Sequence, residues 1–560
     1  MPETFELASQ ITIKVNGADV EPDVMAHLVF VEVDQHAHLP AIFTIRAADP
    51  EFELIDKGPF DLTDEIEIRA QKPDGTWATL IKGEITSLEP EFQEGMIAQL
   101  AVRGYDKSHR LYREMKSQAH LNKKDSDLAS EIASGAGLQA DVEVTSTVYD
   151  HIFQHNQSDL AFLQERARRI GYECFVSDGK LVFRKPLSRG AGITLRWGDD
   201  LLSFYPRMNL AEQVDEVIVR GWSVDRQQPI VGRARQGGLY PEIQESRNGA
   251  AWARRFGSGK HVILEENVTS QAEADHLAAA RLDEISGAFV QAEGEAFRRP
   301  DIQAGKPVTL EALGDRFSGT YLVTSARHVY TAEGLKTTFS VRGTRTGQIL
   351  EEAGLRSPRP IDPGVVTGVV TNTDDPQAWG RVKVKFPWMT EDAESDWARI
   401  VGAGAGPEAG FLVVPEVGDE VLVAFEQADF RRPYVLGGLW NGQHALPPDA
   451  PSAGGELPLA RIWQSRSGHK IAVFDNADNK IEIATSGGHR ITLDDANRVI
   501  RISTSGGVVI TLDDGGSKVT LEGNEVQIKA SGSLKIEAGA NMDLQAGGQI
   551  TVKGAVINLN

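Results

Sequence analysis

A short repeat near the C-terminus constrains this chain more than any other feature of its 560 residues. Ile491–Asp495 (ITLDD) recurs 19 residues later as Ile510–Asp514 (ITLDD), and a looser copy begins at Ser467. After Gly523 the period shortens to 8 residues, with Gly or Ala recurring between apolar positions. Two apolar columns result, one of Val526, Leu534, Met542 and Ile550 and the other of Ile528, Ile536, Leu544 and Val552.

Each octad of this repeat predicts one strand with two inward apolar side chains, followed by a tight corner where a small residue fits. Such units are stable only when stacked. Within one chain at three faces per turn, the octads would form little more than one rung, too short for a continuous core, whereas three chains would form about four rungs. Periodicity alone also fits a single-chain solenoid, but this core argument favours a trimeric, intertwined β-helix. Its paired backbone should resist unfolding under load.

The N-terminal two thirds of the chain predict a mainly β fold with helical insertions. Alternating apolar residues between 11 and 103, with turns at Asn16-Gly17 and Asp74-Gly75, predict an antiparallel barrel or sandwich. Helical periodicity then predicts two helices, at 125–134 and 158–170, in a small α/β insert. Strand-like alternation from 214 to 342 predicts a second barrel, interrupted by an Ala-rich helix over 270–285.

Composition shifts mark the boundaries of the later modules. Three prolines between Ser357 and Gly364 indicate an extended linker, and 364–438 is typical of a small closed barrel. A loop rich in Pro, Gly and Ala separates that barrel from the repeat. We therefore predict a double-barrel region with its insert at 1–356, a linker at 357–363, a small barrel at 364–441, a linker at 442–460 and a β-helical needle at 461–560.

Four sequence blocks within the small barrel carry a specific resemblance. They are Trp379–Trp388 (WGRVKVKFPW), Ser395–Ile400 (SDWARI), Gly410–Phe425 (GFLVVPEVGDEVLVAF) and Arg432–Asn441 (RPYVLGGLWN). They resemble the OB-fold domain of VgrG proteins and phage baseplate spikes, and the module order extends the resemblance to nearly the whole chain. The positions that match this signature are Gly380, Arg381, Val382, Pro387, Trp388, Gly410, Pro415, Gly418, Arg432, Pro433 and Gly437.

The resemblance implies a homotrimeric hub and needle in a contractile injection system. Three subunits would join baseplate and tail-tube proteins at one end and a PAAR-type tip protein at the other, and sheath contraction would drive the needle into a target envelope. Val556, Ile557 and Leu559 would offer the tip protein an apolar platform, although they fit equally well as the last core residues of the rod. Effector cargo would be a separate chain. The machine could be an extracellular particle, a type VI secretion system or a phage tail.

Charge and hydropathy exclude several other classes. A formal net charge of -22 disfavours nucleic acid as a partner. The first residues show no signal peptide, and no run of 18 apolar residues occurs, so we expect cytoplasmic assembly, no membrane anchor, and later release in an extracellular or ejected particle. The single cysteine, Cys174, is expected to be a small buried hydrophobic residue rather than a nucleophile.

No residue pattern identifies a catalytic, metal or cofactor site, so we expect a protein that is not an enzyme. His36 and His38 lack a third ligand nearby, and the repeated Asp pairs fit strand-ending turns better than calcium sites. Gly257–Lys260 (GSGK) lacks the flanking residues of a phosphate loop and is expected to be an exposed basic loop. The alternative functions are a carbohydrate-active or a receptor-binding β-helix spike, and the short octads that end the chain disfavour both.

Overall fold

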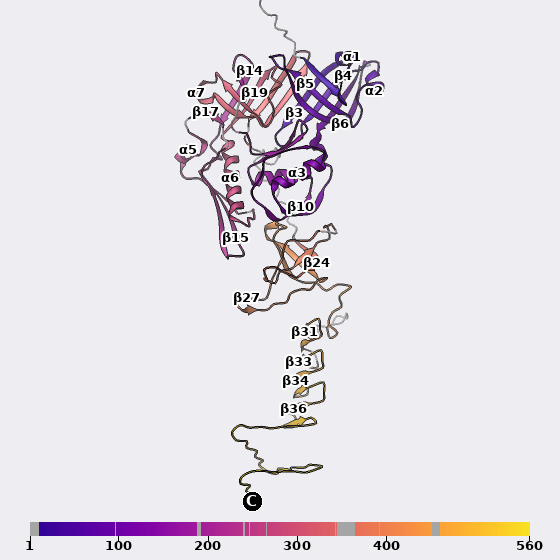
Figure 1. The fold of residues 1–560 in the computed structure, drawn as a ribbon, viewed down its shortest axis with the longest axis vertical. Coiled ribbons are helices and arrows are strands. Elements are labelled where there is room, and N and C mark those ends of the chain that lie inside the picture. The colour runs from indigo at the N-terminus through magenta and orange to yellow at the C-terminus, as the bar shows by residue number, and fades with distance from the viewer. Residues whose placement is uncertain are drawn as a thin grey trace, which may run out of the picture. The chain divides into compact units, whose positions relative to one another are not determined.

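The structure is a computed structural model in which the chain forms two compact units, Met1–Leu439 and Trp440–Asn560 (Figure 1). The linker expected at 357–363, and residues 451–459 of the second linker, lie outside the described residues. The residues that the structure describes are 10–95, 97–187, 192–238, 241–245, 247–264, 266–341, 343, 364–390, 393–450, 460–475 and 477–559.

The first unit contains one continuous sheet of eleven strands. The antiparallel pair formed by Tyr330 and Val31 belongs to the ladder that joins its two halves. In spatial order its strands are β14 (Leu201–Met208), β19 (Val290–Phe297), β23 (Gly334–Val341), β22 (Ser325–Thr331), β3 (Leu28–His36), β4 (Ile42–Ala48), β7 (Ile97–Asp106), β6 (Trp77–Gln93), β5 (Glu65–Gln71), β1 (Ile11–Val15) and β2 (Ala18–Asp19).

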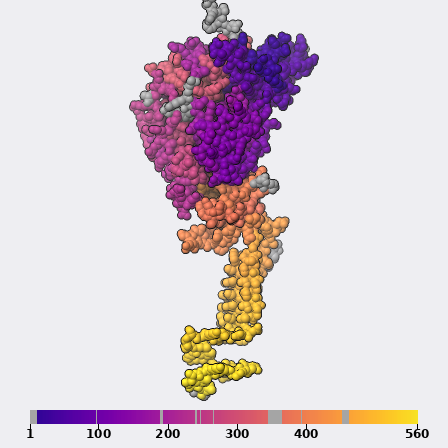
Figure 2. All heavy atoms as spheres, viewed as in Figure 1, coloured from indigo at the N-terminus to yellow at the C-terminus, as the bar shows by residue number. Residues whose placement is uncertain are grey.

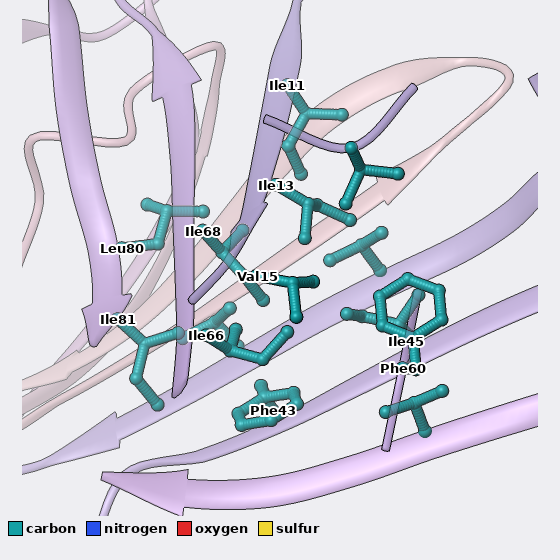
Figure 3. Packing of buried hydrophobic residues seen from close by; sticks show 14 of the residues in the cluster. Ile11, Ile13, Val15, Phe43, Ile45, Phe60, Ile66, Ile68, Leu80 and Ile81 are labelled. Carbon is teal, nitrogen blue, oxygen red and sulfur yellow. The ribbon is translucent and has the colours of Figure 1, made fainter. Parts of the chain in front are cut away.

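Two separate hydrophobic cores lie against this sheet, one for each predicted barrel. Phe43 and Ile68 are fully buried in the first core (Figure 3). Tyr321 and Phe339 are buried in the second. A four-stranded sheet closes over the second core, with strands β13 (Ile193–Arg196), β20 (Pro307–Glu311), β21 (Gly319–Leu322) and β17 (Glu242–Ile243). The two predicted barrels are confirmed, but they share one sheet.

The predicted α/β insert follows the first barrel and has a core of its own. Its helices α3 (Asp125–Gly135) and α4 (Asp159–Arg169) match the predicted ones within a residue or two. Ser158 caps α4, because its hydroxyl oxygen accepts a hydrogen bond from the Ala161 amide at 3.3 Å. The strands of the insert are β8 (Lys116–Lys123), β9 (Gln139–Val142), β10 (Tyr149–Gln157), β11 (Glu173–Ser177) and β12 (Lys180–Arg184).

A second α/β lobe interrupts the second barrel, and the sequence did not predict it as a separate body. Helix α6 (Gln271–Gly287) packs on a three-stranded sheet of β16 (Gln228–Ala234), β15 (Glu216–Ser223) and β18 (Lys260–Ile263), and the lobe has its own core. The sequence predicts the helix, but it predicts the strands of this lobe as part of the second barrel. The short helices that precede the small barrel are α1 (Pro22–Ala26), α2 (Glu53–Lys57), α5 (Gly249–Ala253), α7 (Gly314–Phe317), η1 (Lys107–Tyr112) and η2 (Arg254–Phe256).

The small barrel completes the first unit. Its sheet has five strands in the order β25 (Lys383–Lys385), β24 (Val365–Asn372), β29 (Glu420–Phe425), β30 (Pro433–Gly438) and β26 (Arg399–Ile400). A two-stranded hairpin, β27 (Ala405–Gly406) and β28 (Ala409–Gly410), and the short helix η3 (Glu426–Ala428) lie outside this sheet. Just before β25, Val382 adds an isolated antiparallel bridge to Ala398.

The second unit contains a regular ladder in which each strand pairs antiparallel with the next along the chain. The 19-residue repeat corresponds to two strands of this ladder, since β34 and β36 carry its two copies. The strands are β31 (Ala460–Gln464), β32 (Lys470–Phe474), β33 (Lys480–Ala484), β34 (Arg490–Asp494), β35 (Val499–Ser503), β36 (Val509–Asp513) and β37 (Lys518–Glu522).

The octads after Gly523 form no strand among the described residues up to 559. In Figure 2 this segment, drawn in yellow, is a single extended chain. Its apolar side chains are exposed. In one chain alone, an octad strand has no neighbour with which to pair its backbone. The octad strands and the β-helix therefore stay a prediction.

Candidate functional site

The first signature block forms a tight polar turn in the small barrel. Gly380 has a positive φ of 72°, a conformation that costs a side-chain-bearing residue free energy. Arg381 lies directly after it and makes a two-point ion pair with Asp375, with Nη2–Oδ1 at 2.7 Å and Nε–Oδ2 at 3.1 Å. These hydrogen bonds hold the pKa of the Asp375 carboxyl well below its usual value. The guanidinium also lies over the Trp379 and Trp397 rings. The contacts of this block therefore stabilise the turn.

The remaining signature residues have structural roles in the small barrel. Val382 is fully buried, and Trp388 stacks on Phe386 at 5.2 Å between ring centroids. Gly410 has a φ of 149°, and a Cβ built on it would lie 2.3 Å from the carbonyl oxygen of Gly404. The other positions of the signature have similar structural roles. Pro387 follows β25, Pro415 precedes β29, Gly418 has a φ of 94°, and Arg432, Pro433 and Gly437 lie in or beside β30.

A buried ion-pair cluster joins the small barrel to both α/β lobes. Arg431 Nη1 donates to Glu273 Oε1 at 3.1 Å, and Arg169 Nη2 donates to the same oxygen at 2.9 Å. Both arginines also donate to the carbonyl oxygen of Asn267 at 3.1 Å. Asp429 completes the cluster, with its Oδ2 2.9 Å from Arg431 Nη2. One residue from the small barrel thus contacts α6, and one from α4 contacts the same carboxylate.

The electrostatics of this cluster favour the fully ionised state. Burial alone would raise the pKa of Glu273, but Arg431 and Arg169 outweigh it and lower that pKa to about 2. The same cations lower the pKa of Asp429, and the two carboxylates raise the pKa of Arg431. Because each charge is paired, removing any one of them would leave an uncompensated buried charge.

A second set of polar contacts lies beside this cluster. Arg432 Nε donates to Glu426 Oε2 at 2.6 Å, and the Tyr434 hydroxyl donates to the same oxygen at 2.7 Å. The Glu426 carbonyl accepts a hydrogen bond from Asn267 Nδ2 at 2.6 Å. The signature residue Arg432 therefore positions η3, and η3 contacts the second α/β lobe.

Aromatic rings extend the same contact toward the α/β insert. His155 of β10 lies 4.1 Å from Phe430 and 5.7 Å from Trp388, measured between ring centroids. Phe153 lies 5.6 Å from Phe430, and His151 Nε2 lies 3.3 Å from the Glu394 carbonyl oxygen. We call the ion-pair cluster and these rings together the seam. Sequence reasoning missed it, apart from the signature residue Trp388.

The ladder of the second unit has two unlike faces. The second and fourth residues of β33 to β36 are apolar and pair across strands, for example Ile491 with Ile502 and Ile502 with Ile510. On the other face, which we call the polar face, the middle residues of β33 to β36 are polar. Glu482 there is almost fully buried beneath Lys470 and Arg490. We call the exposed set the apolar face: Ile471, Ile481, Ile483, Ile491, Leu493, Ile500, Ile502, Ile510, Leu512, Val519 and Leu521, each 38–68% exposed.

The predicted tip platform is also exposed within one chain. Leu559 is 91% exposed, and Val556 and Ile557 are exposed as well. None of the three lies in a strand. Their role at a tip stays a prediction.

The other residues considered for chemistry lie in ordinary structural positions. Cys174 is buried in the core of the α/β insert, and burial raises the pKa of its thiol. Lys260 begins strand β18 and pairs with Glu216 at 3.5 Å, so it does not lie in a loop as predicted. Asp494 accepts a hydrogen bond from the Asn497 amide at 2.8 Å, and Asp513 accepts one from the Gly516 amide at 2.9 Å. The turn role is thus confirmed for the first Asp of each repeated pair.

No group of three or more His, Cys, Asp or Glu side chains in the described ranges is placed to hold a metal ion, and His36 Nε2 lies 3.2 Å from Asp34 Oδ1. Among the helices of the described ranges, none is long and apolar enough to cross a membrane.

Two regions of the first unit match known protein families. Residues 6–332 match the family model of the Alg8 N-terminal domain, and residues 366–440 match that of the type VI secretion system/phage-baseplate injector OB domain. The type VI secretion system spike protein VgrG5 of Pseudomonas aeruginosa is 24% identical over 382 residues, which cover 58% of this chain and 45% of that protein. VgrG1b of the same organism is 34% identical over 104 residues, which cover 17% of this chain and 14% of that protein. The matches span less than half of these relatives' lengths.

Solved structures share the fold at low sequence identity. The Escherichia coli c3393 protein, a type VI secretion component similar to the T4 bacteriophage tail proteins gp27 and gp5, has a TM-score of 0.50 at 14% identity, over 76% of this chain and 99% of that chain. A chain of the lidded Francisella PdpA-VgrG complex has a TM-score of 0.53 at 10% identity, over 92% of this chain and 80% of that chain. The mainly β fold is therefore shared with spike and tail proteins.

Proposed function

This chain belongs to the VgrG hub-spike family, with residues 6–332 in the family of the Alg8 N-terminal domain, and from that premise we propose that it is the homotrimeric central spike of a contractile injection system. In this role its N-terminal region joins baseplate and tail-tube proteins, and its C-terminal repeat forms the needle. Sheath contraction drives the needle into the target envelope. The function is mechanical rather than enzymatic, and we propose no cofactor and no nucleic-acid partner.

The apolar face of the ladder is the observation that carries this proposal. A sheet of seven strands exposes a continuous row of Ile, Leu and Val on one side. Its other side carries polar residues at the centre of β33 to β36, and Glu482 there pairs with Lys470 at 2.7 Å. Burying such a row is worth about 1.5–3 kcal/mol per fully covered side chain. Three copies facing a common axis would cover all three rows and leave the polar faces in water. The same arrangement would give each octad strand a neighbour in another chain.

The division into hub, small barrel and needle is part of the same proposal, with linkers at 357–363 and 442–460. A PAAR-type tip protein would bind at Val556, Ile557 and Leu559, and effector cargo would be a separate chain. The spike would assemble in the cytoplasm and then leave as part of an extracellular or ejected particle.

The solution mass of the full-length protein tests the proposal first. Light scattering should give three times the chain mass of 61.0 kDa at micromolar concentration. A trimer that persists on dilution supports the shared needle. A monomer at every concentration would overturn it, because the apolar face would then be covered by nothing from a second copy.

A further inference from the structure

Two histidines of β10 lie within the seam between the α/β insert and the small barrel. His151, Phe153 and His155 alternate along the strand, so their side chains point to the same side of it. That side contacts small-barrel residues, among them Phe430 and Trp388. The small barrel therefore docks on two groups that can gain a charge near neutral pH.

His155 has a poor environment for a positive charge. Its ring packs against Phe430 at 4.1 Å and against Trp388 at 5.7 Å, between centroids. Its Nδ1 is buried, and in the described part of the chain it has no hydrogen-bond partner. A protonated ring would place an unpaired, charged N–H there, which costs more than an unpaired neutral nitrogen. Burial accordingly lowers the pKa of His155.

His151 is buried more deeply and meets groups of both signs. Its Nε2 lies 3.3 Å from the Glu394 carbonyl oxygen, and its Nδ1 is buried without a partner among the described residues. Burial lowers its pKa and is the largest effect, opposed by Asp396 and the Glu394 carbonyl and assisted by Lys383 and Arg431. The two cations and the desolvation thus outweigh the nearby carboxylate.

We propose that His151 and His155 form an acid-sensitive clasp, whose protonation releases the small barrel from the α/β insert. The clasp lies within one chain, so the inference goes beyond the proposed function and does not depend on the trimer. The ring contacts of the seam are closed when both imidazoles are neutral and open when they take up protons.

The direction of the pH effect follows from linkage. A histidine with a lowered pKa in the folded state stabilises that state fully above its unfolded pKa of about 6.5, and the stabilisation is lost as the pH falls below that value. The ion-pair cluster of the seam does not titrate in this window, because the pKa of Glu273 is lowered to about 2. Opening in this window would therefore come from the two histidines and not from the carboxylates of the ion-pair cluster.

Hydrogen–deuterium exchange of the full-length protein between pH 7.5 and 5 tests the clasp. After correction for intrinsic exchange rates, we expect at least tenfold faster exchange in 149–157 and 425–431 at pH 5, with little change in the first-barrel strand β4. Equal rates at both pH values in the seam peptides would overturn the proposal. So would an equal acceleration in β4, because that would be general loosening.

Variants separate the histidines from other acid effects. His151→Phe with His155→Phe should keep the seam peptides protected at pH 5, and His155→Phe alone should reduce the acceleration. His489→Gln, at an exposed position of the ladder, should leave the wild-type response unchanged. If the double variant does not fold, exchange in His155→Phe and in the wild type, each compared with β4, still tests the clasp. A wild-type response in the single and double variants would contradict the clasp.

Discussion

Arg431 Nη1 lies 3.1 Å from Glu273 Oε1, and this ion pair connects the small barrel to the helix of the second α/β lobe. The two residues are 158 positions apart in the sequence. Glu273 is at the start of α6, where a carboxylate is also favoured by the helix dipole. A force applied to the small barrel would therefore reach the hub through a buried, fully paired contact.

The first prediction concerns removal of this cation. Arg431→Met would leave Asp429 and Glu273 buried with only Arg169 nearby, so we expect the free energy of unfolding to fall by about 3 kcal/mol. Chemical denaturation with tryptophan fluorescence would measure it. Arg226→Met, at an exposed turn position, is the matched control and should change stability by less than about 0.5 kcal/mol. A loss at position 431 no larger than the control would contradict the structural role of the cluster.

The second prediction is the pH dependence of this ion pair. The folded pKa of Glu273 is about 2, below the usual value near 4.3 for an unfolded chain. Its stabilisation is therefore fully present above about pH 4.3 and is lost as the pH falls toward 2. The stability difference between wild type and Glu273→Gln, measured by denaturation, should be constant from pH 7 to 5 and shrink between pH 4 and 2. A difference that shrinks already between pH 7 and 5 would contradict the lowered pKa.

Sequence reasoning succeeded where the signal is local. The helices predicted at 158–170 and 270–285 are present, and the serine that begins each predicted range is the N-cap in the structure. It missed the second α/β lobe, because short strands that alternate apolar and polar residues look the same in a lobe as in a barrel. It also missed the contact of Arg431 with Glu273, since no spacing pattern links residues so far apart. The repeat was recognised, but its division into two strands per 19 residues required the structure.

The third prediction addresses the apolar face of the ladder. Ile502→Lys would place a charge at the centre of the proposed trimer contact, and an unpaired buried charge costs several kcal/mol. We expect the mass by light scattering to shift from trimer toward monomer. Thr511→Lys, on the polar face of the adjacent strand, should leave the trimer intact. If both variants remain trimeric, the apolar face is not the contact between copies.

The fourth prediction separates two glycines of the signature. A side chain at Gly410 is strained by its φ of 149° and by the Gly404 carbonyl oxygen 2.3 Å from an added Cβ. Gly437 has open space around an added Cβ and no positive φ. Gly410→Ala should therefore lower the free energy of unfolding by about 1–3 kcal/mol, and Gly437→Ala should change it little. Equal effects in thermal unfolding would mean that the strained turn does not control stability.

The fifth prediction concerns the proposed tip platform. Leu559 is 91% exposed in one chain, so a charge there should not disturb the fold of the chain itself. If a PAAR-type tip protein covers this side chain, burying it contributes about 1.5–3 kcal/mol, and Leu559→Glu should weaken the complex at least tenfold. Calorimetry with the purified tip protein would measure the dissociation constant. Asn558→Glu adds the same charge one position earlier, so it controls for charge alone. Equal losses of affinity in the two variants would mean that charge repulsion causes the effect and that Leu559 is not part of the platform.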